Sequence, residues 1–201
     1  MRTRGWSGSP PASDDEARER ILVATRACID RDGVGIGIAD VARELGIARP
    51  TVYRYFPSTE LLLIAVVIES TQGLLDRIDQ HRRPGRTSLA DHVVETVALV
   101  LEQLPAEPYL WLMLTEGRSS LFAVGVTSPL SIGFGRALVD RMPVADLSER
   151  LTPTELGELV ETIVRVVQSF MLDPGRPPRR GKDLRGYLER WLAPAVTALG
   201  H

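Results

Sequence analysis

Five residues close together in the chain are of the types that bind DNA bases and phosphates: Arg49, Thr51, Tyr53, Arg54 and Tyr55. An arginine can donate two hydrogen bonds to guanine O6 and N7, and a threonine can contact a thymine methyl group. A tyrosine hydroxyl can donate to a phosphate oxygen. Together these residues could recognise double-stranded DNA if one structural element presents them on one side.

The residues 38–63 have the spacing of two helices joined by a tight turn. Apolar side chains recur at three- and four-residue intervals from Val41 to Leu45 and so share one face of a first helix. Gly46 follows, where a left-handed backbone costs little only for glycine. In a second helix Val52 and Phe56 point inward and leave the polar residues outward. This pattern is typical of a helix-turn-helix, whose second helix can enter the major groove.

Three segments around this pattern resemble the N-terminal domain of the tetracycline-repressor (TetR) family of bacterial transcription regulators: ILVATRACIDRDG, DVARELGI and TVYRYFPSTELLL. The resemblance covers residues 20–63 closely, and beyond them only length and helical layout are similar. It rests on the joint occurrence of Gly33, Ala42, Gly46, Thr51, Tyr53, Tyr55, Phe56 and Leu61. The resemblance implies a DNA-binding head, followed by a helical domain that binds an effector and forms a dimer.

Three positions depart from the family pattern. Family members often carry Ser or Thr at the N-cap of the second helix, Ser at the N-cap of the third and Lys early in the fourth, where this chain has Gly37, Ala48 and Thr59. Ala48 has no side-chain acceptor, which costs about 0.5–2 kcal/mol of local stability. Nonspecific DNA affinity should therefore rest on arginines, including Arg2 and Arg4 of the N-terminal arm. The predicted DNA-binding residues are Arg49, Pro50, Thr51, Tyr53, Arg54, Tyr55, Gly37, Arg43 and Thr59.

The chain as a whole predicts an all-α fold, because helical apolar spacing recurs without alternating strand patterns. We expect a disordered arm over 1–12, a helix-turn-helix domain over 13–57 and an effector-binding and dimerisation domain over 58–201. Ser13, followed by three acidic residues, predicts the start of the first helix. The predicted helices cover 13–31, 38–45, 49–55, 58–79, 88–104, 108–115, 129–141, 153–172 and 182–199. The apolar stripe predicted for the fourth helix is Leu61, Ile64, Ala65, Ile68, Gln72 and Leu75.

An effector site is implied by the TetR resemblance, and such pockets are mostly apolar with a few polar anchors. We expect a partly apolar small molecule to contact Glu95, Trp111, Met113, Arg118, Phe122, Phe134 and Gln168, each of which is singly also a common core or surface residue. The last two predicted helices have broad apolar faces, which indicates a four-helix interface between two copies. The predicted interface residues are Leu156, Val160, Ile163, Val167, Leu184, Leu188, Trp191, Leu192, Ala195 and Leu199.

Composition limits the other possibilities. The 201 residues are 44% apolar and can bury a substantial core, while a net charge of −2 gives no overall signal of DNA binding. A single cysteine, Cys28, excludes a disulfide within the chain and suits the cytoplasm. The first twenty residues lack the apolar run of a signal peptide, and the longest apolar stretch, 61–68, is too short to cross a bilayer. We therefore expect a soluble protein without a membrane partner.

Catalytic motifs are not apparent. The three histidines, His81, His92 and His201, lack metal-ligand spacing, and no nucleophile motif or phosphate-binding loop occurs. The glycines at 33, 35 and 37 form G-x-G-x-G without the preceding strand of a dinucleotide site. The sequence thus predicts no catalytic residue, metal or cofactor.

The predicted function is a ligand-responsive transcriptional repressor, which binds a pseudo-palindromic operator as a homodimer and is released by a small-molecule effector. One alternative is a regulator without an effector, or an activator. A helical enzyme with a DNA-binding head and a purely structural interaction protein are alternatives of other classes.

Overall fold

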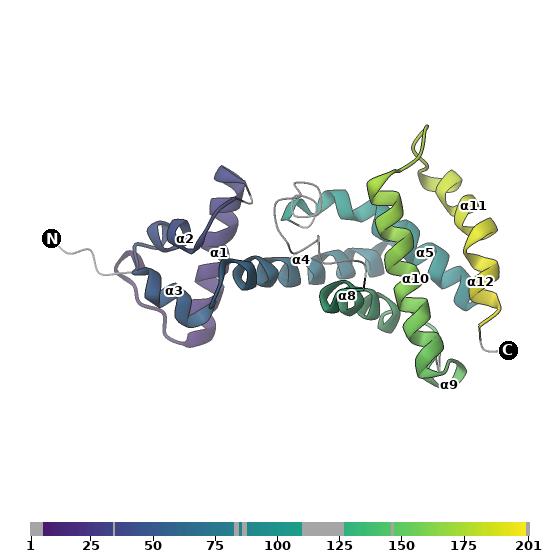
Figure 1. Ribbon diagram of the computed structural model, residues 1–201, viewed down its shortest axis with the longest axis horizontal. Helices are drawn as coiled ribbons and strands as arrows, with labels where there is room; N and C mark the ends of the chain where they lie inside the picture. Colours follow the sequence, from purple (N-terminus) through teal and green to yellow (C-terminus); the bar gives the residue numbers. More distant parts are fainter. Residues whose placement is uncertain are drawn as a thin grey trace. The chain divides into compact units, whose positions relative to one another are not determined.

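The computed structural model describes residues 6–33, 35–82, 85, 88–109, 127–145 and 147–199. Every regular element in these ranges is a helix, which confirms the predicted all-α fold (Figure 1). None of the described helices is long and apolar enough to span a membrane. The α-helices are α1 (Asp14–Asp32), α2 (Ile38–Glu44), α3 (Arg49–Tyr55), α4 (Thr59–His81), α5 (Leu89–Gln103), α8 (Pro129–Asp140), α9 (Leu147–Arg150), α10 (Pro153–Leu172), α11 (Gly181–Trp191) and α12 (Ala193–Thr197). Two 3-10 helices are η1 (Trp6–Gly8) and η2 (Leu104–Ala106).

The predicted helix bounds agree with α1 to α5, α8 and α10 to within two residues. Short α9 was not predicted. The helix expected over 108–115 lies outside the described residues apart from its first two positions.

Two compact units make up the described chain. The first contains the residues up to Gln72 together with 107–109, and the second contains Gly73–Ala106 and the described residues from 127 onward. Helix α4 contributes residues to both. The predicted domain boundary between residues 57 and 58 stays a prediction.

Helix α1 is the core element of the first unit. Its N-terminus is capped by Ser13, whose Oγ accepts a hydrogen bond from the backbone N–H of Glu16 at 3.1 Å. Its buried face includes Ile21, Leu22, Thr25, Cys28 and Ile29. Burial, reinforced by the nearby carboxylate of Glu44, raises the pKa of the Cys28 thiol. Cys28 is accordingly a core residue.

Helix α4 buries a different face from the one predicted. Leu61 and Ile68, two members of the predicted stripe, are exposed. The buried side chains of α4 are Leu62, Leu63, Val66, Val67, Leu74, Leu75 and Ile78. Of the six residues in the predicted stripe, only Leu75 is among them. The reason is that residues 61–68 are apolar on every side, and a 3.6-residue period cannot then fix which side faces the core.

Helix α5 is the central element of the second unit. A capping box starts it, in which Ser88 Oγ accepts from the N–H of Asp91 at 3.1 Å and Asp91 Oδ2 accepts from the N–H of Ser88 at 3.3 Å. From Leu89 to Val100 all but one of its residues are buried. Helices α10, α11 and α12 pack on α5, and α8 packs on α10 (Figure 1).

A buried ion pair joins α11 to α5. The Arg185 guanidinium donates to both carboxylate oxygens of Glu95, with Nε to Oε2 at 2.8 Å and Nη2 to Oε1 at 3.0 Å. Its Nη1 also donates to Glu102 Oε1 at 2.6 Å. The Glu95 side chain is fully buried and that of Arg185 nearly so, and the two carboxylates raise the pKa of Arg185. The charge of Glu95 thus sits in the core because Arg185 neutralises it there.

The C-terminal helix predicted over 182–199 is two helices in the structure, α11 and α12, which makes that prediction wrong. Pro194 is the cause, because its ring nitrogen cannot donate to the carbonyl four residues earlier and its ring crowds that carbonyl. Helix α11 ends before Leu192, and α12 begins at Ala193 with Pro194 in its first turn, a position where proline is tolerated.

Gly135 permits the close approach of α8 and α10. A Cβ atom placed on Gly135 would lie 2.6 Å from Val164 Cγ2 and 3.0 Å from Val160 Cγ1, both on α10. Gly133, two residues earlier on the same helix, has no atom within 4 Å of such a Cβ.

We expect Gly135→Ala to lower the free energy of unfolding by about 1–3 kcal/mol, because the added methyl group overpacks this crossing. Gly133→Ala is the matched control and should instead stabilise the protein by about 0.4–1 kcal/mol, through helix propensity and a less flexible unfolded chain. Urea unfolding of both variants measures the difference. If Gly135→Ala stabilised the protein, α8 and α10 would be able to move apart without a loss of stability.

We expect Arg185→Met to destabilise the protein by about 3–5 kcal/mol, because it leaves the Glu95 carboxylate in the core without its guanidinium. The double variant Arg185→Met, Glu95→Leu should recover most of this loss, since no charge is then buried. Chemical denaturation of the two variants tests this expectation, and equal losses in both would contradict it.

Candidate nucleic-acid interface

The turn between α2 and α3 is built as the sequence predicts. Gly46 has a φ of +63°, and its N–H donates to the carbonyl of Arg43 at 3.1 Å. The N–H of Ile47 donates to the carbonyl of Ala42 at 2.9 Å. These two bonds form a Schellman motif, which ends α2 and sets the direction of the chain into α3.

Helix α3 starts without a side-chain cap, as expected from Ala48. Pro50 lies in its first turn, and the N–H of Thr51 donates to the carbonyl of Ala48 at 2.9 Å. Val52 and Phe56 are buried, in agreement with the prediction that they face the core. The short helix is therefore fixed by its apolar side rather than by its N-terminus.

The opposite side of α3 presents the predicted DNA-binding residues to solvent. Arg49, Pro50 and Arg54 are exposed, and Tyr53 is 50% exposed although it is a large aromatic residue. Thr51 and Tyr55 are half-buried. The structure thus brings six of the nine predicted residues together on one short helix.

The other three predicted residues lie at the starts of α2 and α4 and on the exposed side of α2. Gly37 is the N-cap of α2, and its N–H donates to Asp40 Oδ2 at 3.0 Å. A Cβ on Gly37 would lie 3.8 Å from Thr59 Oγ1, so the two helix starts are neighbours. Arg43 is exposed and its Nη1 lies 2.9 Å from Asp40 Oδ1. The Gly37 N–H, and after it Arg43, lower the pKa of the Asp40 carboxyl.

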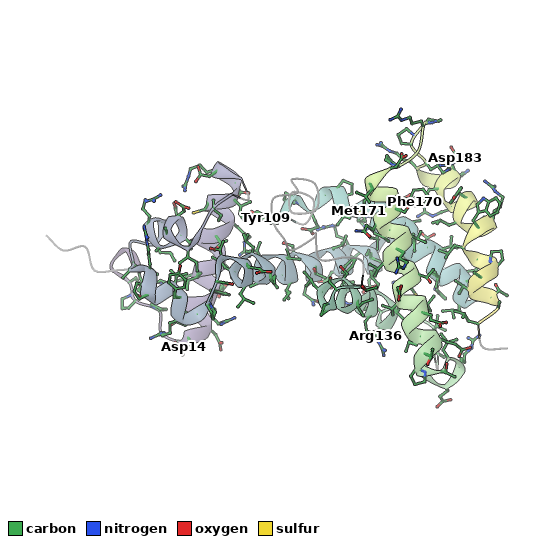
Figure 2. All side chains as sticks on the ribbon, in the orientation of Figure 1. Asp14, Tyr109, Arg136, Phe170, Met171 and Asp183 are labelled. Atoms are coloured by element: carbon green, nitrogen blue, oxygen red, sulfur yellow. The ribbon has the colours of Figure 1, made fainter. Side chains whose placement is uncertain are left out.

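Two residues of α1 contact α3 and escaped the sequence analysis. Arg18 Nη1 donates to the backbone carbonyl of Tyr55 at 3.1 Å, and its guanidinium lies 4.7 Å from the centre of the Phe56 ring. Asp14 accepts hydrogen bonds from Tyr55 and Arg54, and Figure 2 shows it at the start of α1 near α3. About forty residues separate the partners, and no local pattern in the sequence reports such a contact.

The predicted effector residues fall into two groups. Trp111, Met113, Arg118 and Phe122 lie outside the described residues. Phe134 on α8 and Gln168 on α10 are half-buried, and both helices belong to the second unit. Glu95 is fully buried and held by Arg185.

Most of the predicted dimer-interface residues are buried within the single chain. The seven buried residues are Leu156, Val160, Ile163, Val167, Leu184, Leu188 and Leu192. The helices that carry them pack against α5 and α8, so these side chains have little solvent-exposed area left for contact with a second copy. The other three are accessible: Trp191 is 70% exposed, Ala195 is exposed and Leu199 is half-buried.

Comparison with known proteins identifies the family. Residues 21–66 match the family model described as bacterial regulatory proteins, tetR family. An uncharacterised HTH-type transcriptional regulator of Mycobacterium tuberculosis is 31% identical over 193 residues, which cover 90% of this chain and 86% of that protein. The HTH-type transcriptional repressor KstR of Rhodococcus jostii is 31% identical over 162 residues, covering 78% of this chain and 70% of that protein.

A solved structure shows the same fold over nearly the whole chain. The TetR family repressor AlkX from Dietzia sp. matches with a TM-score of 0.59 and 18% identity, covering 96% of this chain and 100% of that one. The relatives at 31% identity extend well beyond the helix-turn-helix into the remaining helices. The chain belongs to the TetR family of bacterial transcriptional regulators.

Proposed function

We propose that this protein is a repressor that binds a pseudo-palindromic operator as a homodimer and leaves the DNA when a small-molecule effector binds. The observation that carries the proposal is the exposed side of α3. There Arg49, Pro50, Tyr53 and Arg54 face solvent while Val52 anchors the helix in the core. The similarity to the repressor KstR supports repression rather than activation.

The exposed side of α3 suits the major groove. A helix and its side chains fit the width of that groove, and each base pair presents a distinct set of donors and acceptors there. Arg54 supplies donors for guanine, and Thr51 and Pro50 supply apolar contacts for thymine methyl groups. Arg49 and Tyr53, which are also exposed on α3, are proposed to contact phosphates, together with Gly37, Arg43 and Thr59.

The proposed homodimer uses a smaller surface than the sequence predicts. Trp191, Ala195 and Leu199 carry it, because they remain accessible on α11 and in the segment that follows. A tryptophan side chain buries a large apolar area when a partner covers it, and tryptophan is common at the centres of protein interfaces. A two-fold dimer would bring two copies of α3 to two half-sites one helical turn of DNA apart.

The proposed effector binds in the second unit, with Phe134 and Gln168 as contacts. Trp111, Met113, Arg118 and Phe122, which lie outside the described residues, stay expectations from the sequence. We leave Glu95 out of the site, because Arg185 already occupies both of its oxygens. Helix α4 supplies residues to both units, so a change in its C-terminal half is the proposed route to the DNA-binding head.

Selection of bound sequences from a random DNA pool, repeated with a panel of candidate small molecules, tests this function. We expect an enriched sequence with two related halves, and at least one compound that reduces its recovery. Such a compound must bind the operator complex less tightly than the free protein by the factor by which it weakens operator binding, commonly about 5–150-fold. A pool without enrichment would refute DNA recognition, and a compound that binds both forms equally is no inducer.

We expect Arg54→Ala to weaken operator binding by about 1–3 kcal/mol and to relax base preference at one position in each half-site. The matched control is Arg165→Ala, because Arg165 is an exposed arginine on α10, paired with Glu161 and remote in sequence from the helix-turn-helix. Binding titrations against a set of single-base operator variants measure both effects. Equal weakening for all DNA sequences would make Arg54 a phosphate contact.

We expect Trp191→Glu to dissociate the dimer and to lower operator affinity, since it places a charge in the proposed interface. Trp191 is exposed in the single chain, so the variant should keep its helical circular-dichroism signal. Glu189→Ala, an exposed change on the same helix, is the control. Analytical ultracentrifugation measures the outcome, and a folded Trp191→Glu dimer would show that the interface lies elsewhere.

A further inference from the structure

The base-reading arginine of α3 has an acidic partner on another helix. Arg54 Nη2 donates to Asp14 Oδ1 at 3.2 Å, and the Tyr55 hydroxyl donates to the same oxygen at 2.8 Å. The Arg54 guanidinium lies 4.5 Å from the centre of the Tyr55 ring, and Nη2 also contacts the Tyr55 hydroxyl. Asp14, Arg54 and Tyr55 therefore form one cluster across α1 and α3.

This cluster is open to solvent and borders the surface proposed to meet DNA. Asp14 is 80% exposed and Arg54 is 66% exposed in their side chains. An open hollow of about 410 Å³ adjoins them and is lined also by Trp6, Ser13, Thr51 and Tyr55. An ion pair so exposed adds little to folding stability, since water screens it and two side chains lose freedom. The ion pair can therefore matter more for the choice of DNA acceptor by Arg54 than for folding stability.

Asp14 acts differently on the two kinds of DNA acceptor that Arg54 can reach. A phosphate oxygen carries a full negative charge, so it competes with the Asp14 carboxylate for the guanidinium and is repelled by it. Guanine O6 and N7 belong to a neutral base and are repelled much less. Both contacts of Arg54 use Nη2, and among the described residues no hydrogen bond is made by Nε or Nη1. A two-bond contact with guanine uses one of these nitrogens together with Nη2, which then exchanges its contact with the Tyr55 hydroxyl for the base.

We propose that Asp14 is a specificity-determining residue, which disfavours phosphate contacts by Arg54 and so biases this arginine toward guanine. The inference rests on the proposed operator binding. On DNA that lacks guanine at the position facing Arg54, this arginine could bind a phosphate instead. The Asp14 carboxylate weakens that phosphate contact. Discrimination rises because binding to wrong sequences is weakened, which is a general route to specificity.

The test compares Asp14→Asn with Asp15→Asn. Both changes remove one carboxylate from the exposed first turn of α1, and among the described residues Asp15 makes no hydrogen bond or ion pair with α3, whereas Asp14 makes both. Dissociation constants are measured for the selected operator and for a scrambled duplex of equal length, at two salt concentrations. The general loss of negative charge then affects both variants alike, and the contact with Arg54 affects only one.

For Asp14→Asn we expect tighter binding to the scrambled duplex and a fall in the ratio of operator to scrambled affinity, on the order of 2- to 30-fold for a dimer with two such clusters. Asp15→Asn should leave this ratio unchanged. In an Arg54→Ala background, Asp14→Asn should have no more effect on the ratio than Asp15→Asn. An unchanged ratio for Asp14→Asn would overturn the inference.

Two further outcomes separate the possible failures. If Asp14→Asn weakens operator binding and leaves the scrambled duplex unchanged, Asp14 only orients Arg54, and the competition with phosphate is wrong. If the wild-type protein enriches no sequence from a random pool, the proposed function falls and this inference falls with it. An enriched operator with an unchanged ratio would overturn the role of Asp14 alone.

Discussion

The anchoring of α3 by α1 and α2 is the constraint on which the proposed DNA surface depends. A helix of seven residues is not stable in water by itself, because nucleation is unfavourable and few backbone bonds follow it. Ala48 gives its N-terminus no side-chain cap either. The helix is held instead by buried Val52 and Phe56, and by Arg18, which donates to the last carbonyl group of α3 and covers the Phe56 ring. The same contacts hold the outward side chains in place, so the head cannot fold without presenting the residues that we propose to bind DNA.

The second unit meets a different constraint, which is a charge in the middle of its central helix. Helix α5 is buried over almost its whole length, and Glu95 lies within that buried run. Its carboxylate requires a partner in the core, and Arg185 of α11 is the partner that fits, with two parallel hydrogen bonds. A hydrophobic pair could stabilise the contact as well, but it would tolerate slippage of α11 along α5. The ion pair therefore selects one register of α11, and with it the place where Trp191 emerges at the surface.

The parts of the fold that the sequence predicts correctly are those with a local physical cause. The turn that ends α2 needs a residue that tolerates a positive φ, which Gly46 supplies, and the Ser13 hydroxyl caps the N–H of Glu16 three residues later. The errors have causes that are not local. The run 61–68 is apolar on every side, so the buried face of α4 depends on which helices surround it. Seven of the ten residues predicted for the dimer interface are buried within the single chain, and the sequence alone does not separate such burial from burial against a second copy. The contact of Asp14 with Arg54 joins residues about forty positions apart, and only the tertiary structure brings them together.

The charges on the proposed DNA-binding surface weaken its attraction to phosphates. Two of its arginines carry an acidic neighbour, since Arg43 pairs with Asp40 and Arg54 with Asp14. Where many relatives have a lysine early in the fourth helix, this chain has Thr59. Each of these features weakens the attraction to phosphates, which is the part of binding that does not depend on sequence and that salt suppresses. In the proposed function, affinity for an operator would then come largely from base contacts and from the pairing of two heads in one dimer. Such a regulator would spend little time on unrelated DNA, because Asp40 and Asp14 would oppose the phosphate contacts that hold it there.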